Sequence, residues 1–260
     1  MTTPRLYKTE ALVLRQRPLG EADRIVILYT PNYGKLEAKA KGVRKTTSRL
    51  AGHLQPLTRC AIQLARGRSM EVVAGCQTIE AFPGLLGDLD RLSRGLYAAE
   101  LADRFGLERV ESGATYQLLL DTLRRLNKSD SLDLALRYFE MRLLQHSGFR
   151  PELACCLSCG VPLAPVVNHF SPAAGGVLCP RCGPGSLGAR TLSLNALKVL
   201  RLLQRAPWPE VARLHLPPLL SLEIERHLRA YIVHVLERDV NAAAFLERLR
   251  REGVGQPIEA

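Results

Sequence analysis

The sequence lacks the features of a membrane or secreted protein. No apolar run approaches the roughly 18 consecutive residues that a membrane helix needs, and residues 1–10 carry polar and charged side chains where a signal peptide would be apolar. We therefore expect a cytoplasmic protein with no membrane partner. In that compartment the seven cysteines favour metal binding or simple burial over disulfides.

The motifs of several common enzyme sites are also absent. The chain has no G-x-x-x-x-G-K-[ST] phosphate loop, no H-E-x-x-H motif and no G-x-S-x-G motif. His227 and His234 share a face of a predicted helix, but neither has an acidic partner placed to complete a catalytic set. Glu21 and Asp23 sit in a predicted turn, where carboxylates usually bind backbone N–H groups. The sequence predicts no catalytic residues and a protein that is not an enzyme.

Aromatic residues make up only 5% of the 260 residues, whereas basic residues are abundant. The 36 Lys+Arg exceed the 25 Asp+Glu and give a formal net charge of +11, so a polyanion is the first partner to consider. Residues 1–80 hold 14 basic and 6 acidic side chains, a net of +8, and the remainder holds 22 and 19. The basic surplus therefore belongs mainly to the first third of the chain.

That first third has the pattern of short strands. Apolar or alternating stretches at 10–15, 24–30, 35–41, 59–64 and 70–80 are separated by turn residues. Gly34 closes one of these turns and is suited to a positive φ. Strands joined in this way predict a small closed barrel, which leaves few sheet edges exposed.

Beyond Phe82 the apolar residues recur at three- and four-residue steps, which predicts helices. We expect them at 85–105, 118–126, 132–144, 194–203, 219–236 and 245–249, with Ser131 capping the third and Gly148 beyond its end. Residues 150–190 are rich in proline and glycine and interrupt the pattern. The sequence predicts an α+β protein with a barrel domain at 1–80 and an all-α domain at 81–260, the latter with an insertion at about 150–190.

Two C-x-x-C pairs lie in this insertion, each followed by a glycine and separated by nineteen residues. The four cysteines are Cys156, Cys159, Cys179 and Cys182. Two such pairs complete a tetrahedral thiolate site, for which one structural Zn²⁺ is the natural occupant. Reduced buried cysteines or a redox pair are the alternatives. Cys155 is left outside the ligand set, and His169 is expected at the surface.

Basic side chains gather between residues 35 and 49, where Glu37 is the one acid. The six candidate nucleic-acid contacts are Lys35, Lys39, Lys41, Arg44, Lys45 and Arg49. Period two places the lysines of the strand on one face, and residues 42–49 are expected to form a mobile loop. Such side chains bind phosphates without sequence preference, and Tyr29 and Tyr33 could stack on bases. The alternative is a solvated lysine face on an edge strand.

Further short stretches follow one another in a specific order over nearly the whole chain. They are Leu19-Gly20-Glu21-Ala22-Asp23-Arg24-Ile25-Val26, Thr30, Gly34-Lys35, Ala40-Lys41-Gly42-Val43-Arg44-Lys45, Ser48-Arg49, Leu54-Gln55-Pro56, the two cysteine pairs with Gly160 and Gly183, and Glu225-Arg226-His227-Leu228-Arg229-Ala230-Tyr231. In this order and spacing the chain resembles the bacterial recombination mediator family RecO.

The resemblance implies an N-terminal five-stranded OB-fold and a helical domain with an inserted four-cysteine zinc element. Proteins of the family bind single- and double-stranded DNA and anneal complementary strands. They cooperate with RecR to load the RecA recombinase onto DNA coated by single-strand-binding protein (SSB), whose acidic C-terminal tail the helical part holds. Some members lack the full cysteine set, which implies a structural role for zinc. During repair the protein would be associated with the nucleoid.

A second interpretation of the same features comes from a different class. A basic barrel followed by a zinc ribbon would also suit an RNA-binding protein of the ribosome or the transcription machinery. An enzyme with an unrecognised site is the third possibility.

Overall fold

The computed structural model describes residues 6–129 and 131–237. Two compact units divide the chain, Ser131–Val240 forming the second. The first contains β1 (Leu6–Leu19), β2 (Asp23–Thr30), β3 (Gly34–Ala40), β4 (Arg59–Ala65), β5 (Glu71–Glu80), α1 (Pro83–Leu86), α2 (Leu89–Phe105) and α3 (Gly113–Lys128). The second contains α4 (Leu132–His146), β6 (Asn168–Ser171), β7 (Gly176–Leu178), β8 (Arg190–Leu192), α5 (Leu194–Arg205), α6 (Trp208–Val211) and α7 (Pro218–Leu236).

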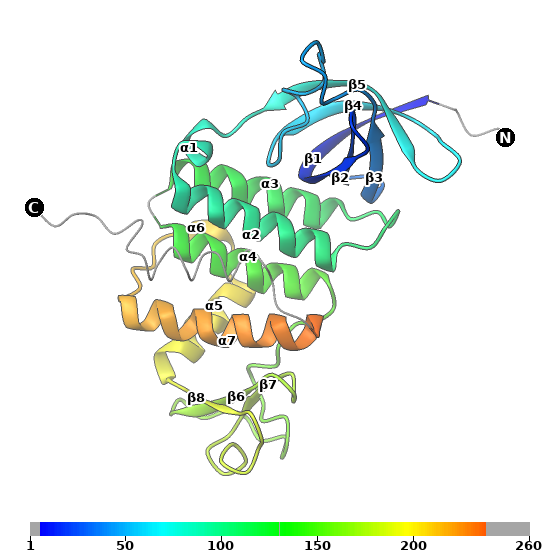
Figure 1. Cartoon of the computed structure of the whole chain (residues 1–260). Helices are drawn as coiled ribbons and strands as arrows, with labels where there is room; N and C mark the ends of the chain where they lie inside the picture. Colours follow the sequence, from blue (N-terminus) through cyan, green and yellow to red (C-terminus); the bar gives the residue numbers. More distant parts are fainter. Residues whose placement is uncertain (1–5, 130, 238–260) are drawn as a thin grey trace, which may run out of the picture. The chain divides into compact units, whose positions relative to one another are not determined.

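The five strands of the first unit close into a barrel with the order β1-β2-β3-β5-β4 (Figure 1). All neighbouring strands are antiparallel except β3 and β5. The long strand β1 closes the barrel because its residues from Leu6 to Leu12 pair with β4 and those from Leu12 to Leu19 pair with β2. The predicted five strands are thus present, and β1 extends beyond its expected ends in both directions.

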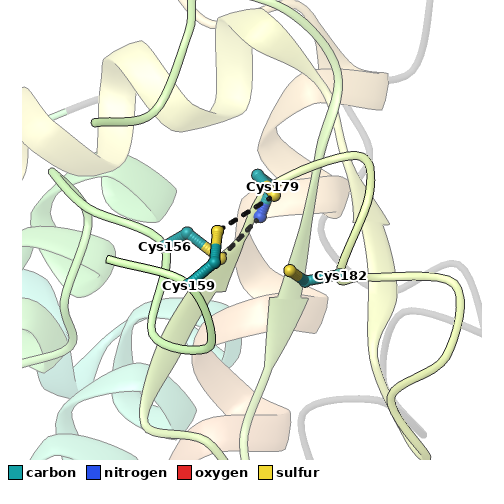
Figure 2. A group of neighbouring side chains, drawn as sticks. All are labelled: Cys156, Cys159, Cys179 and Cys182. Carbon is teal, nitrogen blue, oxygen red and sulfur yellow. Dashed lines mark hydrogen bonds between the residues drawn. The ribbon is translucent and has the colours of Figure 1, made fainter. Parts of the chain in front are cut away.

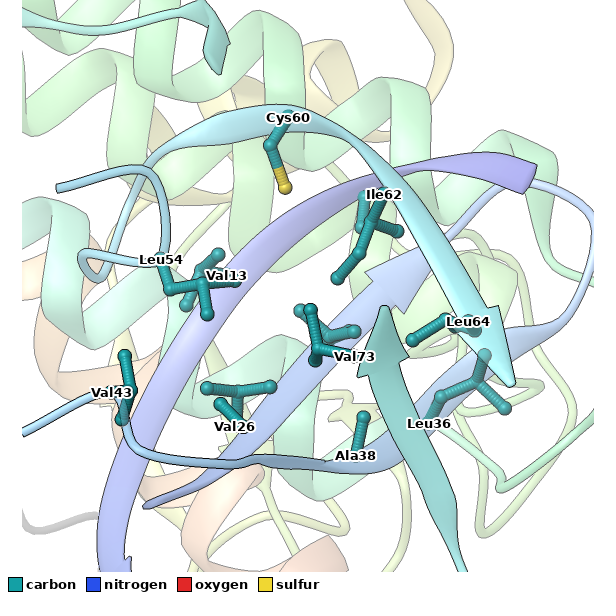
Figure 3. Packing of buried hydrophobic residues seen from close by; sticks show 13 residues of the cluster. Val13, Val26, Leu36, Ala38, Val43, Leu54, Cys60, Ile62, Leu64 and Val73 are labelled. Atoms are coloured by element: carbon teal, nitrogen blue, oxygen red, sulfur yellow. The ribbon is translucent and has the colours of Figure 1, made fainter. Parts of the chain in front are cut away.

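Alternating side chains fill the barrel, as Figure 3 shows. In β3 the small and apolar residues Leu36, Ala38 and Ala40 point inward, which confirms the predicted alternation. Val43 and Leu54, from the connection between β3 and β4, complete the core and are 5% and 0% exposed. Burial of one such aliphatic side chain contributes about 1.5 to 3 kcal/mol, so these two residues anchor a connection that is otherwise largely polar.

A β-bulge in β1 determines which side chains leave the barrel. Val13 pairs with Leu28, but the next pair is Arg15 with Ile27, so Leu14 is an extra residue on this strand. Strict alternation after Val13 would direct Arg15 and Arg17 into the core. The bulge reverses the alternation and leaves both arginines exposed on the outer side.

Helices α2 and α3 pack on each other, and both contact β2. They begin after Asp88 and Ser112, and the Asp88 carboxylate accepts a hydrogen bond from the Arg91 N–H as an N-cap. The segment after α2 runs along the start of β3, where the Lys35 N–H donates to the Leu107 carbonyl and the Arg109 N–H donates to that of Lys35. These contacts place α2 and α3 against the outside of the barrel.

In the second unit, α4 packs on α5, α6 and α7, and the strands β7-β6-β8 form a small sheet between α4 and α5 in sequence. Phe170 of β6 attaches this sheet to α7 through ring contacts with His227 and Tyr231. His227 is only 4% exposed and is a core histidine. No helix within the described ranges is long and apolar enough to span a bilayer.

Each stretch predicted as helix within the described residues contains helix, but the one expected at 85–105 is divided into α1 and α2, because Gly87 ends the first and Asp88 caps the second. The short helix α6 is not among the predicted helices, and the stretch at 245–249 lies outside the described residues. Ser131 stands at the N-cap of α4, but its side chain makes no capping hydrogen bond there. Gly148 follows α4 with φ +83°. The domain boundary expected near residue 80 stays a prediction: β5 ends at Glu80, while α1 to α3 belong to the same compact unit as the barrel.

Substitution of two glycines with positive φ can show how closely the segment after α2 approaches β3. Gly34 has φ +57°, and a Cβ there would lie 1.9 Å from the Val110 carbonyl oxygen, whereas Gly20 has φ +63° and open space around it. Gly20→Ala should cost about 1 to 2 kcal/mol from backbone strain. Gly34→Ala should cost at least about 3 kcal/mol because a backbone clash is added. Urea unfolding of both variants checks this, and equal costs would contradict the close approach at Gly34.

Candidate metal centre and candidate nucleic-acid interface

The small sheet of the second unit brings the two C-x-x-C pairs together. Strand β7 ends at Leu178 and is followed directly by Cys179. The first pair is tied to the same strand, because the Leu157 N–H donates to the Val177 carbonyl over 3.1 Å. Gly160, directly after the first pair, has φ +73°, the left-handed conformation that glycine adopts without strain.

The four thiols form one compact group (Figure 2). The sulfur atoms of Cys156, Cys159, Cys179 and Cys182 all lie within 4.8 Å of one another. A tetrahedron with Zn–S bonds of about 2.3 Å has edges of about 3.8 Å, and the distance between the sulfurs of Cys159 and Cys179 is 3.8 Å. The donor set and its spacing therefore fit Zn²⁺.

Backbone N–H groups face these sulfurs, as expected of thiolate ligands. The Cys179 N–H donates to the Cys156 sulfur over 3.3 Å. Burial acts to raise the pKa of the Cys156 thiol, but hydrogen bonds from Cys179 and two neighbouring N–H groups hold it below the usual value. The backbone thus favours the charged form that a metal requires.

Three neighbours of the cluster have other roles. Cys155 is not part of the four-thiol group, and its N–H donates to the Glu152 carboxylate over 3.1 Å. A Cβ on Gly183 would lie 2.2 Å from the His169 ring, so this glycine permits close packing and, unlike Gly160, has no positive φ. His169 is not part of the four-thiol group, as expected, but it is half-buried against Gly183 and not fully at the surface.

The adjacent cysteines give a matched test of the metal centre. We expect about one zinc per chain after exhaustive dialysis, since four thiolates hold the ion without an open position. Cys159→Ser should lose most of the metal and lower the thermal stability of the protein, whereas Cys155→Ser should keep both. Elemental analysis and thermal melts measure this. Metal-free wild-type protein, or equal loss in the two variants, would refute the site.

The structure divides the six predicted nucleic-acid contacts into two groups. The Lys35 ammonium donates to the Asp103 carbonyl over 2.8 Å and lies 3.4 Å from the Asp103 carboxylate. Lys39 forms an ion pair with Asp23 at 2.9 Å. Asp23 also accepts a hydrogen bond from the Gly42 N–H, which is the main reason its pKa is lowered. These two lysines are partly used within the fold.

The other four, Lys41, Arg44, Lys45 and Arg49, are exposed. In the part of the chain that the structure describes, none of these four forms a salt bridge. Residues 41–49, which we call the basic loop, make a series of turns. The Arg44 N–H donates to the Ala22 carbonyl over 3.0 Å, and its guanidinium donates to the Gly20 carbonyl over 3.2 Å. The loop therefore lies against the β1–β2 turn with its cations facing solvent.

The two tyrosines proposed for base stacking behave differently. Tyr29 is 2% exposed and packs against Gly106, so the expectation that it stacks on bases is wrong. β2 is covered by helices on its outer face, which the local sequence does not reveal. Tyr33 is half-buried and contacts the Tyr7 ring at a centroid distance of 4.9 Å.

Sequence reasoning missed three arginines of the β1–β2 hairpin. Arg15 and Arg17 lie on the outer side of β1, and Arg24 lies opposite Pro18 on β2. The sequence does contain a sign of this arrangement. Alternation continued from Val13 would place Arg15 and Arg17 inside an apolar barrel, which is unfavourable for charged side chains. A bulge avoids this placement, and looking for one would have found Arg15 and Arg17, though not Arg24.

Family models match both halves of the chain. The model of the recombination protein O N terminus matches residues 1–82, and that of its C terminus matches residues 86–243. The chain belongs to the RecO family. The RecO resemblance drawn from the sequence motifs is thereby confirmed.

Curated RecO relatives match nearly the full length. The chain is 42% identical over 247 residues to the DNA repair protein RecO of Roseiflexus sp. (strain RS-1), which covers 95% of this chain and 87% of that protein. It is 40% identical over 250 residues to DNA repair protein RecO of Dehalococcoides mccartyi (strain ATCC BAA-2100 / JCM 16839 / KCTC 5957 / BAV1), covering 96% and 98%. With that of Symbiobacterium thermophilum the identity is 38%, covering 94% and 98%.

Proposed function

We propose that this RecO-family chain is a non-enzymatic DNA repair protein that binds single- and double-stranded DNA through its barrel. The barrel is an OB-fold in this proposal, supported by five strands in the order β1-β2-β3-β5-β4 closed through β1 and β4. OB-folds hold oligonucleotides on their outer strands and loops. Family membership supports a DNA partner over the RNA partner of the rival interpretation.

The observation that carries the proposal is the set of exposed, unpaired cations on the basic loop. Within the described residues Lys41, Arg44, Lys45 and Arg49 are exposed and form no ion pair, so binding phosphates would not require them to leave a carboxylate. The Arg44 guanidinium donates one hydrogen bond to the Gly20 carbonyl and keeps its other N–H groups for a phosphate. Lys35 and Lys39 add positive potential beside them but would have to share their ammonium groups with Asp103 and Asp23. Phosphate contacts of this kind give affinity with little sequence preference.

The remaining functions of the family follow from binding without bond chemistry. Cations along the barrel reduce the repulsion between two complementary strands and so favour annealing. A protein that holds DNA and the C-terminal tail of SSB together raises the local concentration of bare strand. With RecR, this would help load RecA onto SSB-coated DNA at the nucleoid. A structural zinc on the four cysteines would stabilise the sheet of the second unit.

The basic loop can be tested through the salt dependence of DNA binding. Six phosphate contacts to single-stranded DNA predict a slope of about −4 in a plot of log K against log salt. Changing Lys41, Arg44, Lys45 and Arg49 to Gln should make the slope shallower by about 3, since about 0.7 counterion is released per contact. Fluorescence anisotropy at several salt concentrations measures this.

A matched control removes the same charge from the second unit. Arg190, Lys198, Arg205 and Arg213 are exposed there and are changed to Gln together. The slope of this variant should stay within about 1 of the wild-type value. A control variant that lost as much slope as the loop variant would show that net charge, and not the loop, determines binding.

Competition between nucleic acids separates the proposal from the RNA-binding alternative. Labelled single-stranded DNA is displaced in turn by unlabelled single-stranded DNA, duplex DNA and a folded RNA of the same length. We expect both DNA competitors to act at lower concentrations than the folded RNA. Stronger competition by folded RNA would favour the rival function. Co-purification with RecR or SSB tests the partners.

A further inference from the structure

A pocket of about 410 Å³ lies in the first unit, beside the β1–β2 hairpin. Its size falls within the range of about 300 to 1,000 Å³ that holds small ligands. Three arginines line it, Arg15 and Arg17 from β1 and Arg24 from β2. Apolar surface comes from the half-buried Pro56 and Leu96, with the buried Leu14 behind them. The pocket therefore joins a cationic rim to an apolar wall.

Acidic residues hold two of these arginines by one edge and leave the rest of each guanidinium available. The Arg15 Nε lies 2.6 Å from the Asp103 carboxylate, and the Arg17 side chain lies 2.9 Å from that of Glu37. The two arginine side chains remain 51% and 47% exposed. Asp103 is shared with Lys35, so cations exceed carboxylates in this cluster. A guanidinium has five N–H donors, and an oriented one suits a phosphate.

Hydrogen bonds also fix the third arginine and the side of the pocket formed by the β3–β4 connection. Arg24 donates to the Gln16 amide oxygen, and the Gln16 amide nitrogen donates to the Leu54 carbonyl. Gln55 donates its amide N–H to the Ala51 carbonyl over 2.9 Å, which leaves its amide oxygen as an acceptor at the pocket. The polar groups are thus held in place before any ligand arrives.

The position of the β-bulge explains why the pocket exists. Leu14 is the extra residue of β1 and itself lines the pocket. Without the bulge, Arg15 and Arg17 would face the barrel core. Bulges commonly redirect side chains next to binding sites.

The pocket is continuous with the basic loop through the β1–β2 turn. The hairpin strands carry Arg17 and Arg24, and the turn between them accepts the Arg44 N–H at Ala22. Asp23, the first residue of β2, accepts the Gly42 N–H over 2.7 Å. A strand held by its phosphates on the loop would therefore pass beside the pocket.

We propose that this pocket binds one nucleotide, with its phosphate on Arg15, Arg17 and Arg24 and its base against Pro56 and Leu96. The nucleotide is a unit of single-stranded DNA or a free nucleotide, since both present the same groups. For the DNA-bound case the inference rests on the proposed DNA-binding function. It adds that binding depends on a base as well as on phosphates.

The test compares two oligonucleotides with equal numbers of phosphates, one of thymidines and one of abasic sites, at one salt concentration. Wild-type protein should prefer the thymidine strand by about three- to tenfold, the range expected when one base is partly buried. Arg17→Gln combined with Arg24→Gln should abolish this preference and weaken binding of both strands. Arg66→Gln combined with Arg68→Gln, exposed arginines on the β4–β5 turn, should keep it. Thermal melts verify that each variant is folded.

Competition with thymidine 5′-monophosphate separates the two sources of the nucleotide. If millimolar monophosphate removes the preference for thymidine, the pocket accepts free nucleotides; if it has no effect, the pocket requires a nucleotide within a strand. An equal affinity of wild-type protein for both strands, or a preference that survives in the Arg17/Arg24 variant, would overturn the pocket while leaving phosphate binding by the basic loop intact. Failure of wild-type protein to bind either strand would instead refute the proposed function.

Discussion

Barrel closure by a single long strand is the constraint on which the first unit depends. β1 pairs with β4 over its first half and with β2 over its second half, and Leu12 belongs to both pairings. The bulge at Leu14 comes directly after this change of partner. Next to the bulge, the Val13 N–H donates to the Thr58 carbonyl, and the Val13 carbonyl accepts from the Leu57 N–H. The strand can therefore fill the core before the bulge and present cations to solvent after it.

Much of this arrangement can be predicted from local sequence. The five strands follow from apolar runs and turn residues, and the inward set of β3 follows from period two alone. The clustering of the four cysteines can be predicted equally well, because two C-x-x-C pairs need only one hairpin to meet. In both cases the residues that interact are close in sequence or are related by a simple period.

The remaining features depend on contacts between distant parts of the chain. Lys35 has an ordinary strand position, and only the structure shows that its ammonium contacts Asp103, 68 residues later. Tyr29 lies near the end of the apolar strand β2 and is buried beside α2, which begins sixty residues further on. Gly183 and Gly160 each follow a cysteine pair, but their roles differ. Gly160 adopts a positive φ, whereas at Gly183 a side chain would clash with the His169 ring. Such roles arise from packing, which sequence periodicity does not report.

The first unit contains a barrel with a basic loop, and the second unit is built around helices and a four-cysteine cluster. The central claim is that DNA contacts the barrel at the basic loop and the neighbouring β1–β2 hairpin. Photo-crosslinking of single-stranded DNA containing 4-thiothymidine, followed by peptide mass spectrometry, locates the contacts directly. The account predicts crosslinked peptides that contain residues 15–24 and 41–49. Crosslinks confined to the second unit, with none in these segments, would contradict it.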